Sequence, residues 1–341
     1  MALLMAAVLA IAPASTGLHA YAVAVSAGGD RTCVLISNGN VDCYGFDIYG
    51  AGTDYLGGDA TGVATGWYHT CILKSSGDAE CYGGDTWGES DDYTGGDAVA
   101  VAAGYQYSCV LRSNGTTDCW GKNNGALGSS GVGQADDYLL GNATALSAGF
   151  YHSCVLRMDG TVACSGSNGW GQAMDDLAGT AVAVSAGGYH TCVVRTNGDV
   201  DCWGRNDFGQ SAAYLGGDAV AVAAGGVHTC ALLNDGAVSC WGRNIDGEAD
   251  GRTAPLNAAT AVSAGHRHTC SIEPLGSVDC QGYDWYRQSK DWSRLRSPVD
   301  EDGDAVPDDL EAYMCIIEDP DDPLDGSCRW GGPWDYTPYE P

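Results

Sequence analysis

The sequence predicts an all-β fold, a seven-bladed β-propeller with a short, partly irregular acidic C-terminal tail. Three features predict it: a segment repeated seven times at a period near 38 residues, two cysteines at constant spacing in every copy, and a glycine-centred turn between them. A fixed period of about 20 to 50 residues is typical of solenoids, arrays and propellers. Short strands bury their faces only against neighbours, and small sheets that close radially leave only short edges.

We expect three parts in the 341-residue chain. They are a secretory leader at residues 1–20, the propeller at residues 21–290, and a linker, calcium-loop-like segment and acidic tail at residues 291–341. The opening MALLMAAVLAIAPASTGLHA is an apolar run followed by small residues, which is typical of an export signal, although the usual basic start is missing. A short core strand is the alternative interpretation.

The charge of the chain excludes some partners. Its formal net charge is −29, with 44 acidic residues against 15 lysines and arginines. Nucleic acids and anionic membranes need a basic surface, so neither is an expected partner. No stretch after the leader has the roughly 18–20 apolar residues that cross a bilayer, so we expect no membrane insertion. A secreted or cell-surface location follows from the leader and the cysteines.

Fourteen of the 16 cysteines form seven pairs, each ten positions apart. In every pair a glycine stands six residues after the first cysteine, where a three-residue hairpin loop has its left-handed residue. The two cysteines then face each other at a non-hydrogen-bonded position, about 4.5 Å apart and within reach of a disulfide. Reduced core cysteines and metal ligands are the alternatives, and the absence of a C-x-x-C spacing disfavours metal. The predicted pairs are Cys33–Cys43, Cys71–Cys81, Cys109–Cys119, Cys154–Cys164, Cys192–Cys202, Cys230–Cys240 and Cys270–Cys280, with Cys315–Cys328 expected in the tail.

Further repeated residues give the chain a family resemblance. The segment VSAGGYHTCVVRTNGDVDCWGRNDFGQ (Val184–Gln210) resembles the repeat of the regulator of chromosome condensation family. The shared marks are Ala-Gly-x-x-His, the Asn-Gly turn, Trp-Gly after the second cysteine and the final Gly-Gln. The resemblance covers about residues 21–290 and implies a seven-bladed propeller, here in a secreted form. The seventh copy, CQGYDWYRQ, lacks the tryptophan and the late glycine, so we expect a less regular last blade.

Two ionisable positions recur within the copies. A histidine precedes the first cysteine by two in five copies (His69, His152, His190, His228 and His268), with Arg31 and Tyr107 in the others. An acid precedes the second cysteine in five copies (Asp42, Glu80, Asp118, Asp201 and Asp279). A metal or proton site and acid–base catalysis are the functional interpretations. One such residue per blade leaves these groups spread around the ring, so structural roles are favoured.

The segment DEDGDAVPDDLE, Asp300 to Glu311, predicts a calcium site beyond the propeller. It resembles an EF-hand loop, and more closely the Asp-rich calcium loops of thrombospondin type 3 repeats. Hard oxygen ligands at this spacing suit Ca²⁺. Ala305 replaces the glycine that usually makes the sharp turn, and a solvated acidic linker is the alternative. The expected ligands are Asp300, Asp302, Asp304, the carbonyl of Val306, Asp308 and Glu311.

Two surface features lie near the third and fourth copies. The step between these copies is seven residues longer than the usual period, and insertions on one rim of a propeller commonly carry binding specificity. Tyr138, Leu139 and Leu140 are the apolar residues of this insertion and form a candidate partner-binding loop, with a plain surface loop as the alternative. Asn114 and Asn142 match the glycosylation motif Asn-x-Thr.

The function that these features favour is a secreted, disulfide-stabilised module, expected to be monomeric, that binds an extracellular protein or glycan or acts in adhesion, with a calcium-ordered tail. An enzyme-inhibitor propeller is a variant, because the resembled family includes a secreted inhibitor of β-lactamases. Guanine-nucleotide exchange, the activity of the eukaryotic namesake, is disfavoured by the leader, the cysteines and the charge. A glycan-acting enzyme would need converging acids, histidines or a metal, which the repeats do not show, so we expect no enzyme activity.

Overall fold

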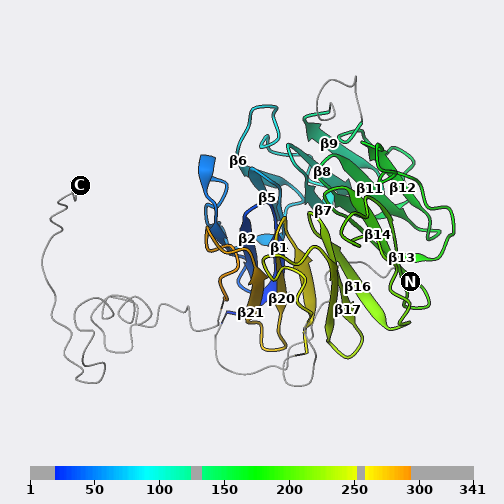
Figure 1. Ribbon diagram of the computed structural model, residues 1–341. Helices are drawn as coiled ribbons and strands as arrows, with labels where there is room; N and C mark the ends of the chain where they lie inside the picture. The colour runs from blue at the N-terminus through cyan, green and yellow to red at the C-terminus, as the bar shows by residue number, and fades with distance from the viewer. Residues whose placement is uncertain (1–19, 124–132, 252–257, 293–341) are drawn as a thin grey trace, which may run out of the picture. The chain divides into compact units, whose positions relative to one another are not determined.

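The computed structural model describes residues 20–123, 133–251 and 258–292, and over these residues the chain is a β-propeller (Figure 1). It has seven antiparallel sheets, or blades, each made of three strands that follow one another in the sequence. A turn of 3-10 helix, Ile48–Gly50, lies between blades 1 and 2. The predicted all-β propeller is therefore confirmed.

The strands of the seven blades have the following bounds. Blade 1 has β1 (Ala22–Ala27), β2 (Arg31–Ile36) and β3 (Val41–Gly45), and blade 2 has β4 (Ala60–Thr65), β5 (His69–Lys74) and β6 (Ala79–Gly83). Blade 3 has β7 (Ala98–Ala103), β8 (Tyr107–Arg112) and β9 (Thr117–Gly121), and blade 4 has β10 (Ala143–Ala148), β11 (His152–Arg157) and β12 (Val162–Gly166). Blade 5 has β13 (Ala181–Ala186), β14 (His190–Arg195) and β15 (Val200–Gly204), and blade 6 has β16 (Ala219–Ala224), β17 (His228–Leu233) and β18 (Val238–Gly242). Blade 7 has β19 (Ala261–Ala264), β20 (His268–Ile272) and β21 (Val278–Gly282), so its first strand has four residues where the others have six.

The hairpin between the second and third strands has the predicted loop and register. In blade 5, the N–H of Arg195 donates to the carbonyl of Asp199 at 2.8 Å, which leaves a three-residue loop. Gly198, the third loop residue, has a φ of +81°. This left-handed conformation is readily adopted by glycine alone, so the loop sets the register. Cys192 therefore lies directly opposite Cys202.

All seven predicted hairpin disulfides are present. The Cα atoms of each pair are 4.0–4.1 Å apart, close to the spacing of a non-hydrogen-bonded position in an antiparallel ladder. By restricting the unfolded chain, each short loop contributes about 2–3 kcal/mol in the chain-entropy model. The pairs are Cys33–Cys43, Cys71–Cys81, Cys109–Cys119, Cys154–Cys164, Cys192–Cys202, Cys230–Cys240 and Cys270–Cys280.

The hydrophobic core lies between the blades. The middle strand of each blade is buried along most of its length, as in β14. Val194 and Val200 of blade 5 pack against Ala219 and Ala231 of blade 6 in one such cluster. Because each blade buries its faces on its neighbours, a single blade has no core of its own.

A ring of backbone hydrogen bonds closes the propeller around its axis. At six of the seven blade junctions, the residue after the repeated glycine donates its N–H to the carbonyl of the matching glycine in the next blade. Between blades 3 and 4, Tyr107 Oη donates to the carbonyl of Gly149 at 3.1 Å. His266 of blade 7 donates to Gly28 of blade 1 at 2.8 Å, which joins the last blade to the first. The other bonds run from Gly29 to Gly66, Trp67 to Gly104, Phe150 to Gly187, Gly188 to Gly225 and Gly226 to Gly265. A short first strand in blade 7 therefore does not prevent closure.

The repeated histidines link neighbouring blades. His190 Nε2 lies 2.8 Å from Thr229 Oγ1 of the next blade, and the same hydroxyl donates to the carbonyl of Gln210 at 2.8 Å. A hydroxyl has one proton, so His190 Nε2 carries a hydrogen and donates to the threonine. The equivalent pairs are His69–Ser108, His152–Thr191, His228–Thr269 and His268–Thr32. We call these contacts the histidine latches.

Two blade junctions use other residues at the latch position. The guanidinium of Arg31 donates to the carbonyls of Trp67 at 3.1 Å and Ala51 at 3.4 Å, across the junction between blades 1 and 2. Tyr107 Oη donates to the carbonyl of His152 at 2.6 Å, across the junction between blades 3 and 4. Every blade junction thus has a buried polar link, and the structural interpretation of the histidines fits this geometry.

Burial sets the protonation state of the latch histidines. All five side chains are fully buried. Burial lowers the pKa of His69, His152, His228 and His268 from 6.5 to about 3, and that of His190 to about 4. They are therefore neutral at physiological pH, as a donor of one hydrogen bond requires.

The acids that precede the second cysteines lie on strand edges. Arg195 Nε lies 2.8 Å from Asp201 Oδ2, and Asp42 Oδ2 accepts the indole N–H of Trp292 at 3.1 Å. Lys74 pairs with Glu80, and Arg112 pairs with Asp118. These carboxylates belong to different blades and do not converge, which favours the hydrogen-bonded edge over catalysis.

Candidate functional site

The predicted calcium site lies outside the described residues. This holds for Asp300, Asp302, Asp304, Val306, Asp308 and Glu311, and also for Cys315 and Cys328. Within the described ranges, no group of three or more His, Cys, Asp or Glu side chains could hold a metal ion. The described part of the chain also has no helix of the length and apolarity needed to span a membrane.

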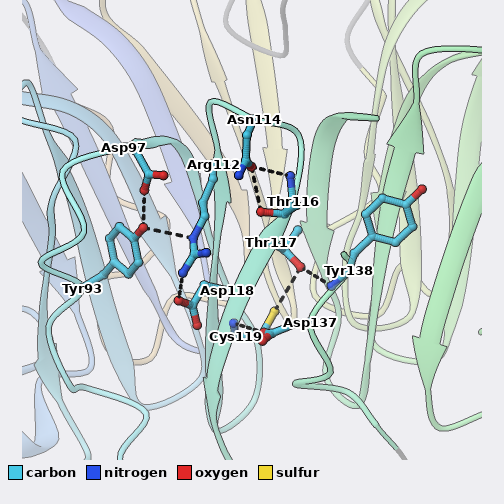
Figure 2. Close-up of polar contacts among 10 residues, drawn as sticks. All are labelled: Tyr93, Asp97, Arg112, Asn114, Thr116, Thr117, Asp118, Cys119, Asp137 and Tyr138. Atoms are coloured by element: carbon cyan, nitrogen blue, oxygen red, sulfur yellow. Dashed lines mark hydrogen bonds and ion pairs between the residues drawn. The ribbon is translucent and has the colours of Figure 1, made fainter. Parts of the chain in front are cut away.

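The candidate partner-binding loop divides into one anchored and two exposed residues. Tyr138 donates its backbone N–H to Thr117 Oγ1 at 2.7 Å, as Figure 2 shows, and its hydroxyl donates to Asn142. Leu139 and Leu140 are 72% and 73% exposed. Tyr138 is half-buried and anchors the loop, whereas the two leucines are the more exposed residues.

The same loop recurs around the propeller. Tyr55, Tyr93 and Tyr214 donate their hydroxyls to Asp59, Asp97 and Asp218, four residues onward, as Tyr138 does to Asn142. Exposed leucines also follow this position in other blades: Leu56 follows Tyr55, Leu215 follows Tyr214, and Leu177 follows Asp176, which occupies the tyrosine position. The insertion thus adds one leucine to a repeated feature rather than creating a distinct site.

The two glycosylation motifs differ in accessibility. Asn114 is exposed at the tip of a hairpin, where its Oδ1 accepts hydrogen bonds from the backbone and hydroxyl of Thr116 (Figure 2). Asn142 is half-buried and accepts the hydroxyl of Tyr138. A glycan on Asn142 would displace that anchor, so Asn114 is the more accessible of the two acceptors.

The blades present two different faces. At one end lie the turns between the first and second strands and the loops that follow the third strands. Hydrogen bonds join these two segments within a blade, as from Arg205 to Tyr189 and from Phe46 to Asp30. We call this end the aromatic face. The opposite end, which carries the Asn-Gly hairpins and the Tyr-Leu loops, is the hairpin face.

Aromatic rings from several blades gather at the centre of the aromatic face. Trp67 of blade 2 lies 4.9 Å from Phe150 of blade 4 and 4.5 Å from His266 of blade 7, measured between ring centroids. Tyr105 of blade 3 lies 5.3 Å from Trp67. Most of these pairs are tilted or edge-on, the geometry that aromatic quadrupoles favour. The complete inner cluster is Trp67, Tyr68, Tyr105, Phe150, Tyr151, Tyr189 and His266.

Glycines in other blades make room for the inner cluster. Gly29, Gly188 and Gly226 occupy the position that Trp67, Phe150 and His266 occupy in their own blades. A Cβ on Gly188 would lie 2.9 Å from the ring of Phe150, and one on Gly226 would lie 2.6 Å from the ring of His266. Glycines thus leave space beside the larger residues around the axis, and the rings of Trp67, Phe150 and His266 line a small central cavity of about 80 Å³.

A second set of aromatic residues lies farther from the axis, in the loops after the third strands. Within the described loops, an aromatic residue stands two positions after a repeated Asp or Asn in five blades. These residues are Tyr49, Trp87, Trp170, Phe208 and Tyr286. Trp285, beside Tyr286, is 79% exposed. The loops also meet across a junction, since the rings of Phe46 and Tyr286 are 4.7 Å apart.

Charged groups on this face are held next to the rings. Lys122 Nζ lies 5.1 Å from the ring centroid of Trp87, and Arg205 Cζ lies 5.2 Å from that of Trp170. Burial raises the pKa of Asp30, although Arg267 and Arg31 oppose the shift. Burial, followed by the charges of Arg267 and Arg243, lowers the pKa of His266 to about 4. His266 is thus neutral within the inner cluster at physiological pH.

The aromatic face was missed by the sequence analysis, although a signal for it was present. The two residues between the repeated glycine and the histidine position are variable, and aromatic residues stand there in four blades, as in GWYH, GFYH and GGYH. The Asn-x-aromatic and Asp-x-aromatic triplets also recur at one position. These aromatic residues stand at variable positions of the repeat, and only the fold brings them together on one face.

Comparison with known families supports the predicted resemblance. A family model described as the regulator of chromosome condensation (RCC1) repeat matches residues 98–125, 143–172, 181–210 and 219–248. The matched residues fall in blades 3 to 6. These blades contain β7 to β18, and blades 1, 2 and 7 have the same strand order and disulfide position. No curated protein sequence matches the chain significantly.

Solved structures show the same fold. The CRINKLY WD40 ectodomain of the Arabidopsis thaliana receptor kinase ACR4 is 25% identical, with a TM-score of 0.59 over 76% of this chain and 93% of that one. The ectodomain of the Physcomitrella patens receptor kinase CR4 is 24% identical, with a TM-score of 0.60 over 76% of this chain and 72% of that one. Prp20p of Saccharomyces cerevisiae is 17% identical, with a TM-score of 0.60 over 73% and 82%.

Proposed function

We propose that this protein is an extracellular binding module whose aromatic face receives a protein or glycan ligand. The gathering of partly exposed rings from at least five blades on one face is the observation that carries the proposal. Aromatic residues are enriched at the centres of protein interfaces, because they bury much apolar area at a small loss of side-chain freedom.

Two further observations support an extracellular location. Seven short-range disulfides fit an oxidising compartment. The ACR4 propeller, at 25% identity, belongs to a receptor ectodomain. The predicted leader and a tail ordered by Ca²⁺ complete the proposal, with the predicted calcium ligands acting through hard oxygen donors.

Substitution of exposed aromatic residues tests the proposed face. Tyr49→Ala and Trp87→Ala together remove two exposed rings of the outer set, and Leu56→Ala and Leu215→Ala together remove two exposed leucines of the hairpin face. Capture from the native extracellular medium is compared for these two variants and the unaltered protein. The first variant is expected to lose the captured ligand while the second retains it. Equal capture by all three proteins would reject the aromatic face as the binding surface.

Calcium in the tail is tested on the full chain. Hydrogen exchange of the segment that contains Asp300 and Glu311 is compared in Ca²⁺ and in chelator. Slower exchange with Ca²⁺ supports ordering of the loop. An exchange rate that chelator does not change would remove calcium from the proposed function, while leaving the propeller face intact.

A further inference from the structure

The outer loops of the aromatic face differ in one chemically important position. In every blade, an Asp or Asn side chain at this position accepts a backbone N–H later in the same loop. It is an amide in blades 3 to 6, namely Asn123, Asn168, Asn206 and Asn244. It is a carboxylate in blades 7, 1 and 2, namely Asp284, Asp47 and Asp85. Since blade 7 adjoins blade 1, the three carboxylates occupy one continuous sector of the ring.

Each carboxylate of this sector stands beside an exposed ring. Tyr49 and Trp87 follow Asp47 and Asp85 by two residues, and Trp285 follows Asp284 directly. These rings are 67%, 48% and 79% exposed, and all three carboxylates are exposed as well. In each of the three blades, the sector therefore pairs one negative charge with one exposed aromatic ring. We call the couples Asp47–Tyr49, Asp85–Trp87 and Asp284–Trp285 the acidic aromatic sector.

The surface has the breadth of a macromolecular contact. The cavity at the centre of the aromatic face has a volume of about 80 Å³. Small-molecule sites are usually about 300–1,000 Å³, so a small ligand would find little enclosure there. Three couples on three blades instead fit an extended chain laid across the loops.

Charge decides the chemistry of that chain. An exposed carboxylate attracts a cation, and the face of an aromatic ring attracts it too. The aromatic face already uses this contact, since Lys122 lies over Trp87 and Arg205 over Trp170. Among the described residues, no lysine or arginine lies over the rings of Tyr49 and Trp285. The net charge of −29 adds long-range attraction for a cationic partner and none for a neutral glycan.

We propose that the acidic aromatic sector binds a segment of a partner protein rich in lysine and arginine. This inference rests on the proposed function and deepens it, because it names the class of ligand. The Asp47–Tyr49 and Asp284–Trp285 couples each receive one cationic side chain, with the carboxylate neutralising the charge and the ring covering its apolar part. Trp87 already has Lys122 over its ring, so Asp85 contributes its negative charge alone. Arg267, a cation of the same sector, is held over the ring of Tyr283 at 5.3 Å.

The chain itself supplies the variant that tests this proposal. Asp47→Asn, Asp85→Asn and Asp284→Asn together remove three charges and keep the acceptor that caps each loop, as Asn168, Asn206 and Asn244 do in other blades. A matched control removes three charges from the hairpin face through Asp78→Asn, Asp199→Asn and Asp235→Asn. Disulfide mapping and thermal unfolding establish that both variants fold.

The probe is a fluorescent peptide of alternating lysine and glycine, and its binding to the full-length protein is followed by anisotropy at low and at physiological salt. The sector variant is expected to bind about tenfold more weakly, while the control variant stays within about twofold of the unaltered protein. The same peptide with acetylated lysines is expected not to bind. Equal weakening in both variants would overturn the proposal, because it would reduce the effect to net charge.

Failure of this inference is distinguishable from failure of the proposed function. If the peptide does not bind, but capture of the native ligand still depends on Tyr49 and Trp87, the binding face stands and the basic ligand is rejected. Binding of a neutral oligosaccharide that is lost in the aromatic variant and unchanged in the sector variant would also overturn the basic ligand. In that case the aromatic face would be a glycan site.

Discussion

Blades 3 to 6 and blades 7, 1 and 2 are built alike and differ where they meet solvent. Both groups have the hairpin disulfide and the same three-strand order. In the first group, which matches the RCC1 repeat, the loop-capping side chain is an amide; in the second it is a carboxylate beside an exposed ring. The constant positions hold the ring together, so the positions free to vary are those that can carry specificity.

Low pH is expected to destabilise the blade junctions that are linked by a histidine more than the two that are linked by Arg31 and Tyr107. The pKa of the latch histidines is lowered to about 3 or 4, so their contribution to stability is complete above about pH 6.5 and is lost as the pH falls. Each histidine adds to this loss of folding free energy, and the five together produce the largest effect expected here. Urea unfolding between about pH 7 and pH 4 measures it.

The junctions without histidine serve as internal controls for this prediction. Arg31 remains charged and Tyr107 remains neutral throughout the range, because burial lowers the pKa of Arg31 only to about 10 and raises that of Tyr107. Hydrogen exchange at about pH 4 is expected to show earlier opening at His190 and His268 than at these two links. A free energy of unfolding that does not change between pH 6.5 and pH 4 would contradict the role of the latches.

Removal of single latches tests whether the two groups of blades share one skeleton. Thr229→Val in blade 6 and Thr32→Val in blade 1 each leave a buried histidine N–H without its acceptor. Each substitution is expected to lower the free energy of unfolding by about 1–3 kcal/mol, as for other buried donors left unpaired. The two values, from denaturant unfolding, are expected to agree within about 0.5 kcal/mol. A larger difference would show that the acidic sector has a different interior.

The skeleton could be predicted from the sequence because each constant residue has a local physical requirement. Gly198 is needed for a left-handed turn, and that turn fixes Cys192 opposite Cys202. The binding face could not be found in this way. Trp67, Phe150 and His266 are far apart in the sequence and meet only because the ring closes. The equivalent position is a glycine in blades 1, 5 and 6, so the aromatic residues do not recur at a fixed period in the sequence.

The predicted binding loop illustrates the same limit. Tyr138 is apolar and lies in an insertion, two features that favoured a binding role. Its anchor to Thr117 is visible only in the fold, as are the equivalent tyrosines of other blades. A longer loop is therefore a weaker indication of specificity than a change of chemistry at a repeated position.

Transfer of the carboxylates to the other blades would extend the acidic sector. Asn168→Asp, Asn206→Asp and Asn244→Asp together keep the loop caps and place charges beside Trp170 and Phe208. Affinity for the lysine–glycine peptide is expected to rise by about three- to tenfold, since two of the new couples match the existing ones. Anisotropy titration measures the change. An unchanged affinity would mean that a carboxylate beside an exposed ring is not sufficient for binding, and that blades 7, 1 and 2 contribute a further feature.

The smallest effect is expected at the hairpin face. Leu139→Ser and Leu140→Ser replace two exposed side chains in blade 4 and leave the hydroxyl contact of Tyr138 intact. The free energy of unfolding is expected to change by less than about 0.5 kcal/mol, as for most surface substitutions, and peptide affinity is expected to stay the same. Loss of native-ligand capture in this double variant, with the aromatic face unaltered, would move the binding surface to the hairpin face. In that outcome the insertion, rather than the carboxylates of blades 7, 1 and 2, would distinguish the blades.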